Sequence, residues 1–178
     1  LLSFGGYGMM RNLSLTIFRN SRGILPIAAV QNAYKFGGAK LMTHNRIRKF
    51  NTSNTYPEQN LDNDLCQAVV ARGTTVFLRG QCPQDLDTSE NIDSHDPVQQ
   101  THKVMQNIQL LIGEAGGKME DLCKVVVYIT DTRHREAIYR TMGQYIKGIY
   151  PVSTGICVTA LARPEWLVEI DATFVIPD

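Results

Sequence analysis

The chain has 178 residues, of which 43% are hydrophobic and 20% are charged, and this composition fits one globular domain with a sizeable core. No apolar run approaches the ~20 residues that a membrane-spanning helix needs, so we expect no membrane partner. Residues 43–178 hold 13 basic and all 17 acidic residues, a formal charge of −4, which argues against nucleic acid as a partner.

The N-terminal segment differs from the rest, because residues 1–57 contain no Asp or Glu and carry a formal charge of +8. Residues 1–41 have the composition of an organelle transit peptide. Upstream sequence foreign to the native protein is the alternative, since the chain begins with Leu and Met42 opens a run typical of a natural start. We expect 1–41 to be a poorly ordered extension and 42–178 to be the folded domain. The domain is expected in the cytoplasm, or in mitochondria if the transit peptide is genuine.

Two short β-rich runs, 65–71 and 74–80, are separated by Arg72-Gly73 and predict a β-hairpin. A polar loop ends at Asp96-Pro97, where Asp96 is expected to cap a helix and Pro97 to occupy its first position. Apolar residues then recur at steps of three and four until Gly116-Gly117, which predicts the end of this helix.

The run "LCKVVVYIT" (122–130) is apolar on both faces and predicts a central, covered strand. Asp131 is expected to cap a second helix that ends near Gly148, with a stripe formed by Ile138, Met142, Tyr145 and Ile149. Two further strands are predicted at 153–161 and 166–176. This order predicts an α+β domain, with two helices on one face of a mixed sheet. The other face then needs a cover, and we expect another subunit to supply it.

The last predicted strand carries two carboxylates on one face. Counting in steps of two places Val168, Ile170, Ala172 and Phe174 on one side, and Leu167, Glu169, Asp171, Thr173 and Val175 on the other. A solvated second face is one interpretation. The flanking Leu167 and Val175 favour another, in which the carboxylates serve proton exchange. The pattern leaves both open.

Other chemistry-bearing residues give weaker signals. His95 and His102 suggest a metal site, but no third ligand follows at a known spacing, so we expect no metal. The four cysteines, Cys66, Cys82, Cys123 and Cys157, form no C-x-x-C pair and are expected to be free thiols in a reducing compartment. Gly80, at the end of a predicted strand, indicates a bulge, a close approach of another backbone, or simply a turn.

Three stretches in order resemble the RidA (YjgF-type) family: the strand end "FLRGQCPQDL", the segment "QQTHKVMQNIQLLIGEAGGKMEDLCKVVVYITD", and "YPVSTGICVTALARPEWLVEIDA". The resemblance runs from about Cys66 to the end of the chain. It implies a chorismate-mutase-like fold and a homotrimer, with sheets around a central barrel and ligand clefts between subunits. It also implies hydrolysis of reactive imines and enamines to keto acids and ammonia, without a cofactor.

Carried over by position, the family's water-orienting Glu matches Glu169 and its strand-end Gly matches Gly80, beside Gln81. The sequence departs elsewhere: Ser153 stands where the family has the Arg that clamps a carboxylate, Gly155 where it usually has Cys, and Cys66 where it has a cleft Tyr. The backbone of Ser153, Thr154 and Gly155 is then the expected anion site. We expect Arg163 or Arg79 to be the alternative sources of the missing charge.

Two functions follow from the resemblance. The first is an imine or enamine deaminase of altered substrate range, with Glu169 as acid and base. The second is a trimeric small-molecule-binding protein that has kept the cleft and lost the chemistry. A ribonuclease or translation-inhibitor role is disfavoured by the acidic domain and by the absence of a His pair suited to RNA cleavage.

Overall fold

The computed structural model describes residues 44–178 of the chain. The predicted extension 1–41 and the proposed start at Met42 lie outside these residues. No helix between residues 44 and 178 combines the length and apolar character that crossing a membrane requires.

Six strands and three α-helices form the domain. In chain order they are β1 (His44–Asn51), α2 (Thr52–Thr55), β2 (Asp64–Ala71), β3 (Thr74–Phe77), α3 (Pro97–Glu114), β4 (Leu122–Ile129), α4 (Arg135–Ile146), β5 (Val152–Cys157) and β6 (Val168–Ile176). Short 3-10 helices at Pro57–Gln59, Met119–Asp121 and Thr132–His134 lie between them.

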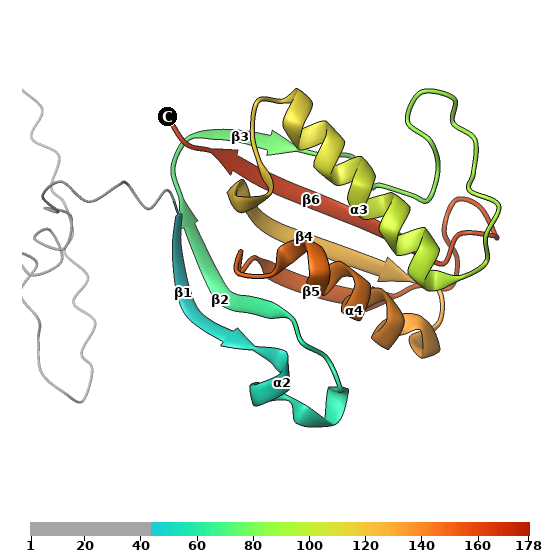
Figure 1. Ribbon diagram of the computed structural model, residues 1–178, viewed down its shortest axis with the longest axis horizontal. Coiled ribbons are helices and arrows are strands. Elements are labelled where there is room, and N and C mark those ends of the chain that lie inside the picture. The colour runs from blue at the N-terminus through green and yellow to red at the C-terminus, as the bar shows by residue number, and fades with distance from the viewer. Residues whose placement is uncertain (1–43) are drawn as a thin grey trace, which may run out of the picture. The chain divides into compact units, whose positions relative to one another are not determined.

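The main sheet has four strands in the order β3-β6-β4-β5. β4 and β5 run parallel, whereas β6 is antiparallel to both of its neighbours, so the sheet is mixed. α3 and α4 lie across one face of this sheet (Figure 1). Between helices and sheet lies the core, to which α3, β4, α4 and β6 contribute fully buried apolar side chains. The α+β class with two helices on one face is therefore confirmed.

The predicted hairpin between 65–71 and 74–80 is wrong. β2 pairs with β1, in a separate antiparallel ribbon that we call the β1–β2 arm (44–71), and β3 pairs with β6. Gly73 adopts φ +135° and packs so closely on the end of β6 that a Cβ would clash with the carbonyl of Ile176. This glycine thus serves a long-range contact with β6, where the sequence suggested a local turn.

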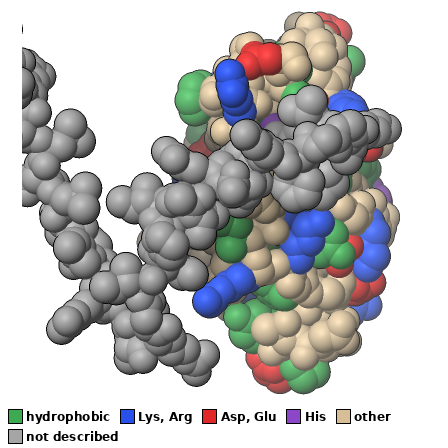
Figure 2. Space-filling model, turned by 90° about the vertical axis from the view of Figure 1, so that its left-hand side faces the viewer, with side chains coloured by type: hydrophobic (Ala, Val, Ile, Leu, Met, Phe, Trp, Pro, Cys, Tyr) green, Lys and Arg blue, Asp and Glu red, His purple; other side chains and the backbone are tan. Residues whose placement is uncertain are grey.

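The arm is held to the domain by polar contacts. The Cys66 amide donates to the carbonyl of Pro151 (3.2 Å), which directly precedes β5. The Arg46 guanidinium donates to the carbonyls of Glu120 (3.0 Å) and Tyr150 (3.4 Å). Figure 2 shows Lys and Arg side chains among apolar ones on the side of the domain where β1 lies. Part of the N-terminal positive charge thus serves to attach the arm.

The two long helices begin largely as predicted. Asp96 Oδ1 accepts a hydrogen bond from the Val98 amide (3.0 Å), Pro97 follows as the first helical residue, and Gly116 ends the segment at φ +80°. Asp131 accepts from the Arg133 amide (2.8 Å), but it caps the 3-10 helix, and α4 starts only at Arg135. Hydrogen bonds from Arg133 lower the pKa of Asp131 to about 2.

The second face of the main sheet is open within residues 44–178, and we call it the open face. It carries Phe77 from β3, Val126 and Tyr128 from β4, Thr154 and Ile156 from β5, and Glu169 and Asp171 from β6. The alternation in β6 is as predicted, with Val168, Ile170, Ala172 and Phe174 buried toward the helices. Phe77 is 78% exposed. The predicted cover by another subunit stays a prediction.

Candidate functional site

The two carboxylates of β6 lie side by side on the open face, opposite β4. Tyr128 stands in register with Glu169, and Val126 with Asp171. The chain after β3 passes the same place and brings Gly80 against them. We call Gly80, Cys82, Tyr128, Glu169 and Asp171 the acid cluster.

Within the acid cluster, the backbone of Gly80 lies directly against the two carboxylates. A Cβ at this position would clash with Oε1 of Glu169 and would lie 3.0 Å from Oδ1 of Asp171. The next residue, Gln81, is buried and exchanges two backbone hydrogen bonds with Ile170, of 2.9 and 3.0 Å. The close approach predicted for Gly80 is therefore real, but its partners are carboxylates and not a backbone.

Two hydrogen-bond donors, the Tyr128 hydroxyl and the Cys82 thiol, lie beside the carboxylates. The Tyr128 hydroxyl donates to Asp171 Oδ2 (3.1 Å), and this bond raises the pKa of Tyr128. Burial, followed by the charge of Glu169 and a hydrogen bond to it, raises the pKa of Cys82 to about 12. Both groups therefore keep their protons at neutral pH, and Cys82 is a donor and not a nucleophile.

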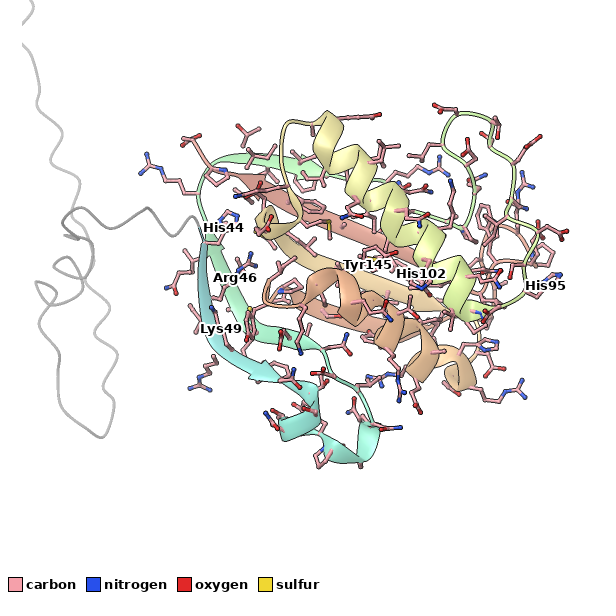
Figure 3. All side chains as sticks on the ribbon, in the orientation of Figure 1. His44, Arg46, Lys49, His95, His102 and Tyr145 are labelled. Atoms are coloured by element: carbon pink, nitrogen blue, oxygen red, sulfur yellow. The ribbon has the colours of Figure 1, made fainter. Side chains whose placement is uncertain are left out.

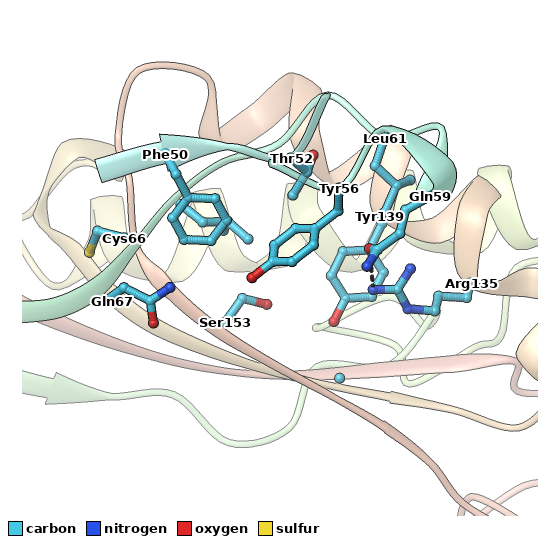
Figure 4. A pocket seen from close by; sticks show the side chains of 12 residues that line it. Phe50, Thr52, Tyr56, Gln59, Leu61, Cys66, Gln67, Arg135, Tyr139 and Ser153 are labelled. Atoms are coloured by element: carbon cyan, nitrogen blue, oxygen red, sulfur yellow. Dashed lines mark hydrogen bonds between the residues drawn. The ribbon is translucent and has the colours of Figure 1, made fainter. Parts of the chain in front are cut away.

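A cavity of about 280 Å³ lies on the other side of the sheet, between the β1–β2 arm, α4 and β5. Its apolar wall consists of Phe50, Leu61, Leu65 and the ring of Tyr139. Its polar groups come from Thr52, Tyr56, Gln59, Gln67, Arg135 and Ser153. Figure 4 shows the ring of Tyr56 reaching into this space with its hydroxyl directed toward Ser153.

Three of the predicted site residues line this cavity: Ser153, Gly155 and Cys66. Ser153 Oγ is enclosed and makes no hydrogen bond that meets normal geometry within residues 44–178. The Tyr139 hydroxyl stands directly over Gly155, where a Cβ would clash with it. Burial raises the pKa of Tyr139, and the nearby Ser153 hydroxyl partly offsets this rise. Gly155 thus makes room for a tyrosine from α4.

The predicted site is divided between the two faces of the sheet. Ser153 and Gly155 are in register with Val125 and Val127, which are fully buried beneath the helices. Glu169 belongs to the opposite, open face, together with the exposed Thr154. One chain therefore does not bring Ser153 and Glu169 together.

The positive charge in the cavity comes from Arg135, which the sequence interpretation missed. Arg163 instead lies over the Trp166 ring (5.7 Å) and 3.9 Å from Glu165 Oε1. Arg79 stands near the acid cluster, where its charge lowers the pKa of Cys82 against the larger effect of burial. The sequence spacing could have indicated this position, because Arg135 and Tyr139 are four residues apart and therefore share one face of α4.

The histidines that suggested a metal do not converge. His102 Nδ1 is 2.9 Å from the Tyr145 hydroxyl, and these two side chains meet between α3 and α4, whereas His95 lies on the loop before α3 (Figure 3). Within residues 44–178 no three metal-ligating side chains are grouped. All four cysteines are free thiols, and only Cys157 is exposed.

Comparison with known proteins gives one consistent family. The model of the family described as "Endoribonuclease L-PSP" matches residues 60–176. A RutC family protein of Pyrococcus abyssi is 30% identical over 56% of this chain and 77% of its own length. Protein DfrA of Myxococcus xanthus is 33% identical over 61% of this chain and 82% of its own. The solved structure of YyfB, a Rid-family protein of Yersinia pestis, superposes with a TM-score of 0.60 at 26% identity, covering 76% of this chain and all of YyfB.

Proposed function

The chain belongs to the endoribonuclease L-PSP family, which includes the Rid (YjgF-type) proteins, and from that premise we propose that it hydrolyses small reactive imines and enamines derived from amino acids. The products are a keto acid and ammonia. The reaction requires no redox cofactor, because hydrolysis of a C=N bond transfers no net electrons.

Glu169 is the acid and base of this proposal. Its carboxylate takes a proton from water as the water oxygen bonds to the imine carbon, and the proton passes to the imine nitrogen. The resulting carbinolamine then loses ammonia as its C–N bond breaks and its hydroxyl becomes the carbonyl. Asp171 accepts from the Tyr128 hydroxyl, whereas Glu169 has the weaker Cys82 thiol as its donor, so in this proposal Glu169 is the carboxylate that accepts the water proton.

The observation that carries the proposal is the contact between Gly80 and Glu169. Only a glycine lets the strand end lie against the carboxylate, since a Cβ there would clash with Oε1 of Glu169. The Gly80 carbonyl has the Cys82 sulfur as a distant neighbour, 4.0 Å away. A water molecule held between this carbonyl and Glu169 would be oriented for attack.

The divided site supports assembly as part of the proposal. Ser153 and Glu169 lie on opposite faces of one sheet, so a ligand touching both needs an edge of one subunit to meet the open face of another. The exposed Phe77 and the 40% exposed Ile156 provide apolar surface for that contact. We therefore keep the homotrimer with inter-subunit clefts as a proposal.

The test is turnover of 2-iminobutanoate or 2-aminoacrylate generated in situ, with keto acid and ammonia measured against buffer. We expect the wild type to accelerate hydrolysis and Glu169→Gln to lose about 100-fold or more of that rate. Glu114→Gln, at an exposed site at the end of α3, is the matched control and should retain full activity. Absence of acceleration by the wild type across several imines overturns the proposal.

A non-catalytic binding protein is the second candidate. The observation that favours it is the substitution of the family's clamping arginine by Ser153, which can offer one hydrogen bond but no charged fork. On this hypothesis a small ligand still occupies the cavity, and Glu169→Gln leaves its affinity unchanged, while no imine is consumed faster than in buffer.

A further inference from the structure

Arg135 is the unpaired member of three arginines on one segment. Arg133 donates through Nε to Asp131 Oδ2 (2.8 Å), and Arg140 Nη2 is 2.6 Å from Glu136 Oε1. Arg135 has no carboxylate within ion-pair distance in the described part of the chain. Its polar partner is the neutral amide of Gln59, 3.2 Å from Nη2. A guanidinium with only a neutral partner keeps most of its capacity to bind an anion.

Arg135 lines the cavity, so an anion bound by its guanidinium would lie in the cavity. Its guanidinium carbon lies 4.7 Å from the centroid of the Tyr139 ring, and both residues line the space beneath the β1–β2 arm. Stacking on this ring fixes the plane of the fork and so reduces the entropy lost on binding. Figure 4 shows Arg135 held between Gln59 and Tyr139 at one end of the pocket.

Ser153 provides a second, independent observation in the same cavity. Its hydroxyl is enclosed and makes no well-formed hydrogen bond within residues 44–178, although it lies close enough to the Tyr139 hydroxyl to lower the pKa of that group. A ligand oxygen can replace this weak contact as its acceptor. Tyr139 presents a further hydroxyl to the same space, and burial keeps it protonated by raising its pKa. A guanidinium and two hydroxyl donors facing an apolar wall suit a small acid with an apolar tail.

We infer that Arg135, from α4, holds the carboxylate of a small 2-oxo or 2-imino acid in this cavity and so replaces the charge absent at Ser153. The inference rests on the proposed function for the imine form of the ligand. The cavity volume of about 280 Å³ restricts the ligand to a few carbon atoms beyond the carboxylate, or to one ring. Arg135 is thus a specificity-determining residue, distinct from the acid cluster.

The test is calorimetric binding of three stable 2-oxo acids, pyruvate, 2-oxobutanoate and phenylpyruvate, to the full chain. The neutral amide of each acid and inorganic phosphate serve as comparison ligands. For at least one acid we expect binding that weakens about 10- to 100-fold in Arg135→Gln and less in Arg135→Lys, which keeps the charge without the fork. The amide should bind at least about tenfold more weakly than its acid. Arg133→Gln, at an exposed arginine two residues away, should match the wild type.

Several results overturn this inference. The inference is wrong if Arg135→Gln binds the oxo acids as tightly as the wild type does, or if the wild type binds none of the three acids. It is also wrong if the wild type binds an acid and its amide equally well, or binds phosphate more tightly than every oxo acid. Glu169→Gln separates the two proposals, because it should keep oxo-acid binding whether or not imines are turned over. If the wild type turns over imines, Arg135→Gln should raise KM more than it lowers kcat. An unchanged KM in Arg135→Gln would refute the role of Arg135 and would leave the proposed hydrolysis standing.

Discussion

The acid cluster and the cavity are built in opposite ways. The acid cluster takes both of its carboxylates from one strand, β6, and needs only β4 and the segment that follows β3 beside it. The cavity draws on the β1–β2 arm, α4 and β5, which are widely separated in sequence. Reactive groups can therefore be recognised within one short motif, whereas the groups that select a ligand depend on how distant segments meet.

The largest effect is expected from a change that prevents the open face of one subunit from contacting another subunit. Phe77→Glu places a charge on the most exposed apolar side chain of the open face. We expect sedimentation to change from a trimer to the 19.9 kDa single chain and imine hydrolysis to fall to the buffer rate, because no subunit then completes the site of another.

Leu110→Glu is the control for this change, since Leu110 is 52% exposed and lies on α3, away from the open face. It should leave both mass and rate unaltered. A wild type that sediments as a single chain while retaining full deaminase activity would falsify the shared site.

A smaller effect is expected from disturbing the acid cluster alone. Gly80→Ala directs a methyl group at Glu169 Oε1, the mobile end of a side chain, so the carboxylate can move aside at little cost in stability. Misplacement of a catalytic group by about 1 Å can cost about 100-fold in rate, and we expect a loss of that order with oxo-acid binding unchanged.

Gly113→Ala is the matched glycine control. Gly113 lies within α3 with no atom within 4 Å of an added Cβ, so alanine should raise the free energy of unfolding by about 0.5–1 kcal/mol without a change in rate. Full activity in Gly80→Ala would show that the contact with Glu169 is not used in catalysis.

The smallest effect is expected in the cavity. Gly155→Ala directs a methyl group at the Tyr139 hydroxyl, and the buried ring must shift to admit it. We expect oxo-acid affinity to fall about tenfold and the free energy of unfolding to drop by about 1–3 kcal/mol, as in other overpacked sites.

The double variant Gly155→Ala with Tyr139→Phe tests that cause, because removal of the hydroxyl oxygen relieves the clash. It should be more stable than the sum of the two single changes predicts. Strict additivity of the two changes in unfolding free energy would contradict a direct contact between these residues.

Local signals in the sequence were sufficient for the helices and the last strand. The Asp96-Pro97 start of α3 and the alternation of β6 depend on neighbours a few residues away, and they appear as predicted. β4 forms at the predicted place, but only one of its two apolar faces is buried within residues 44–178. The predicted hairpin failed because strand pairing is a long-range choice. β3 pairs with β6 at the edge of the main sheet, whereas β2 lies outside this sheet and pairs with β1.

The fold class, the family resemblance and the pair of carboxylates on one face of β6 could be predicted from the sequence, because each rests on short-range periodicity or on a contiguous motif. Three facts could be learned only from the three-dimensional arrangement: Ser153 and Glu169 face opposite sides of the sheet, Gly80 lies against a carboxylate, and Arg135 lines the cavity. These facts depend on strand register and on the docking of the β1–β2 arm and α4. Both are set by packing between segments that no local pattern connects.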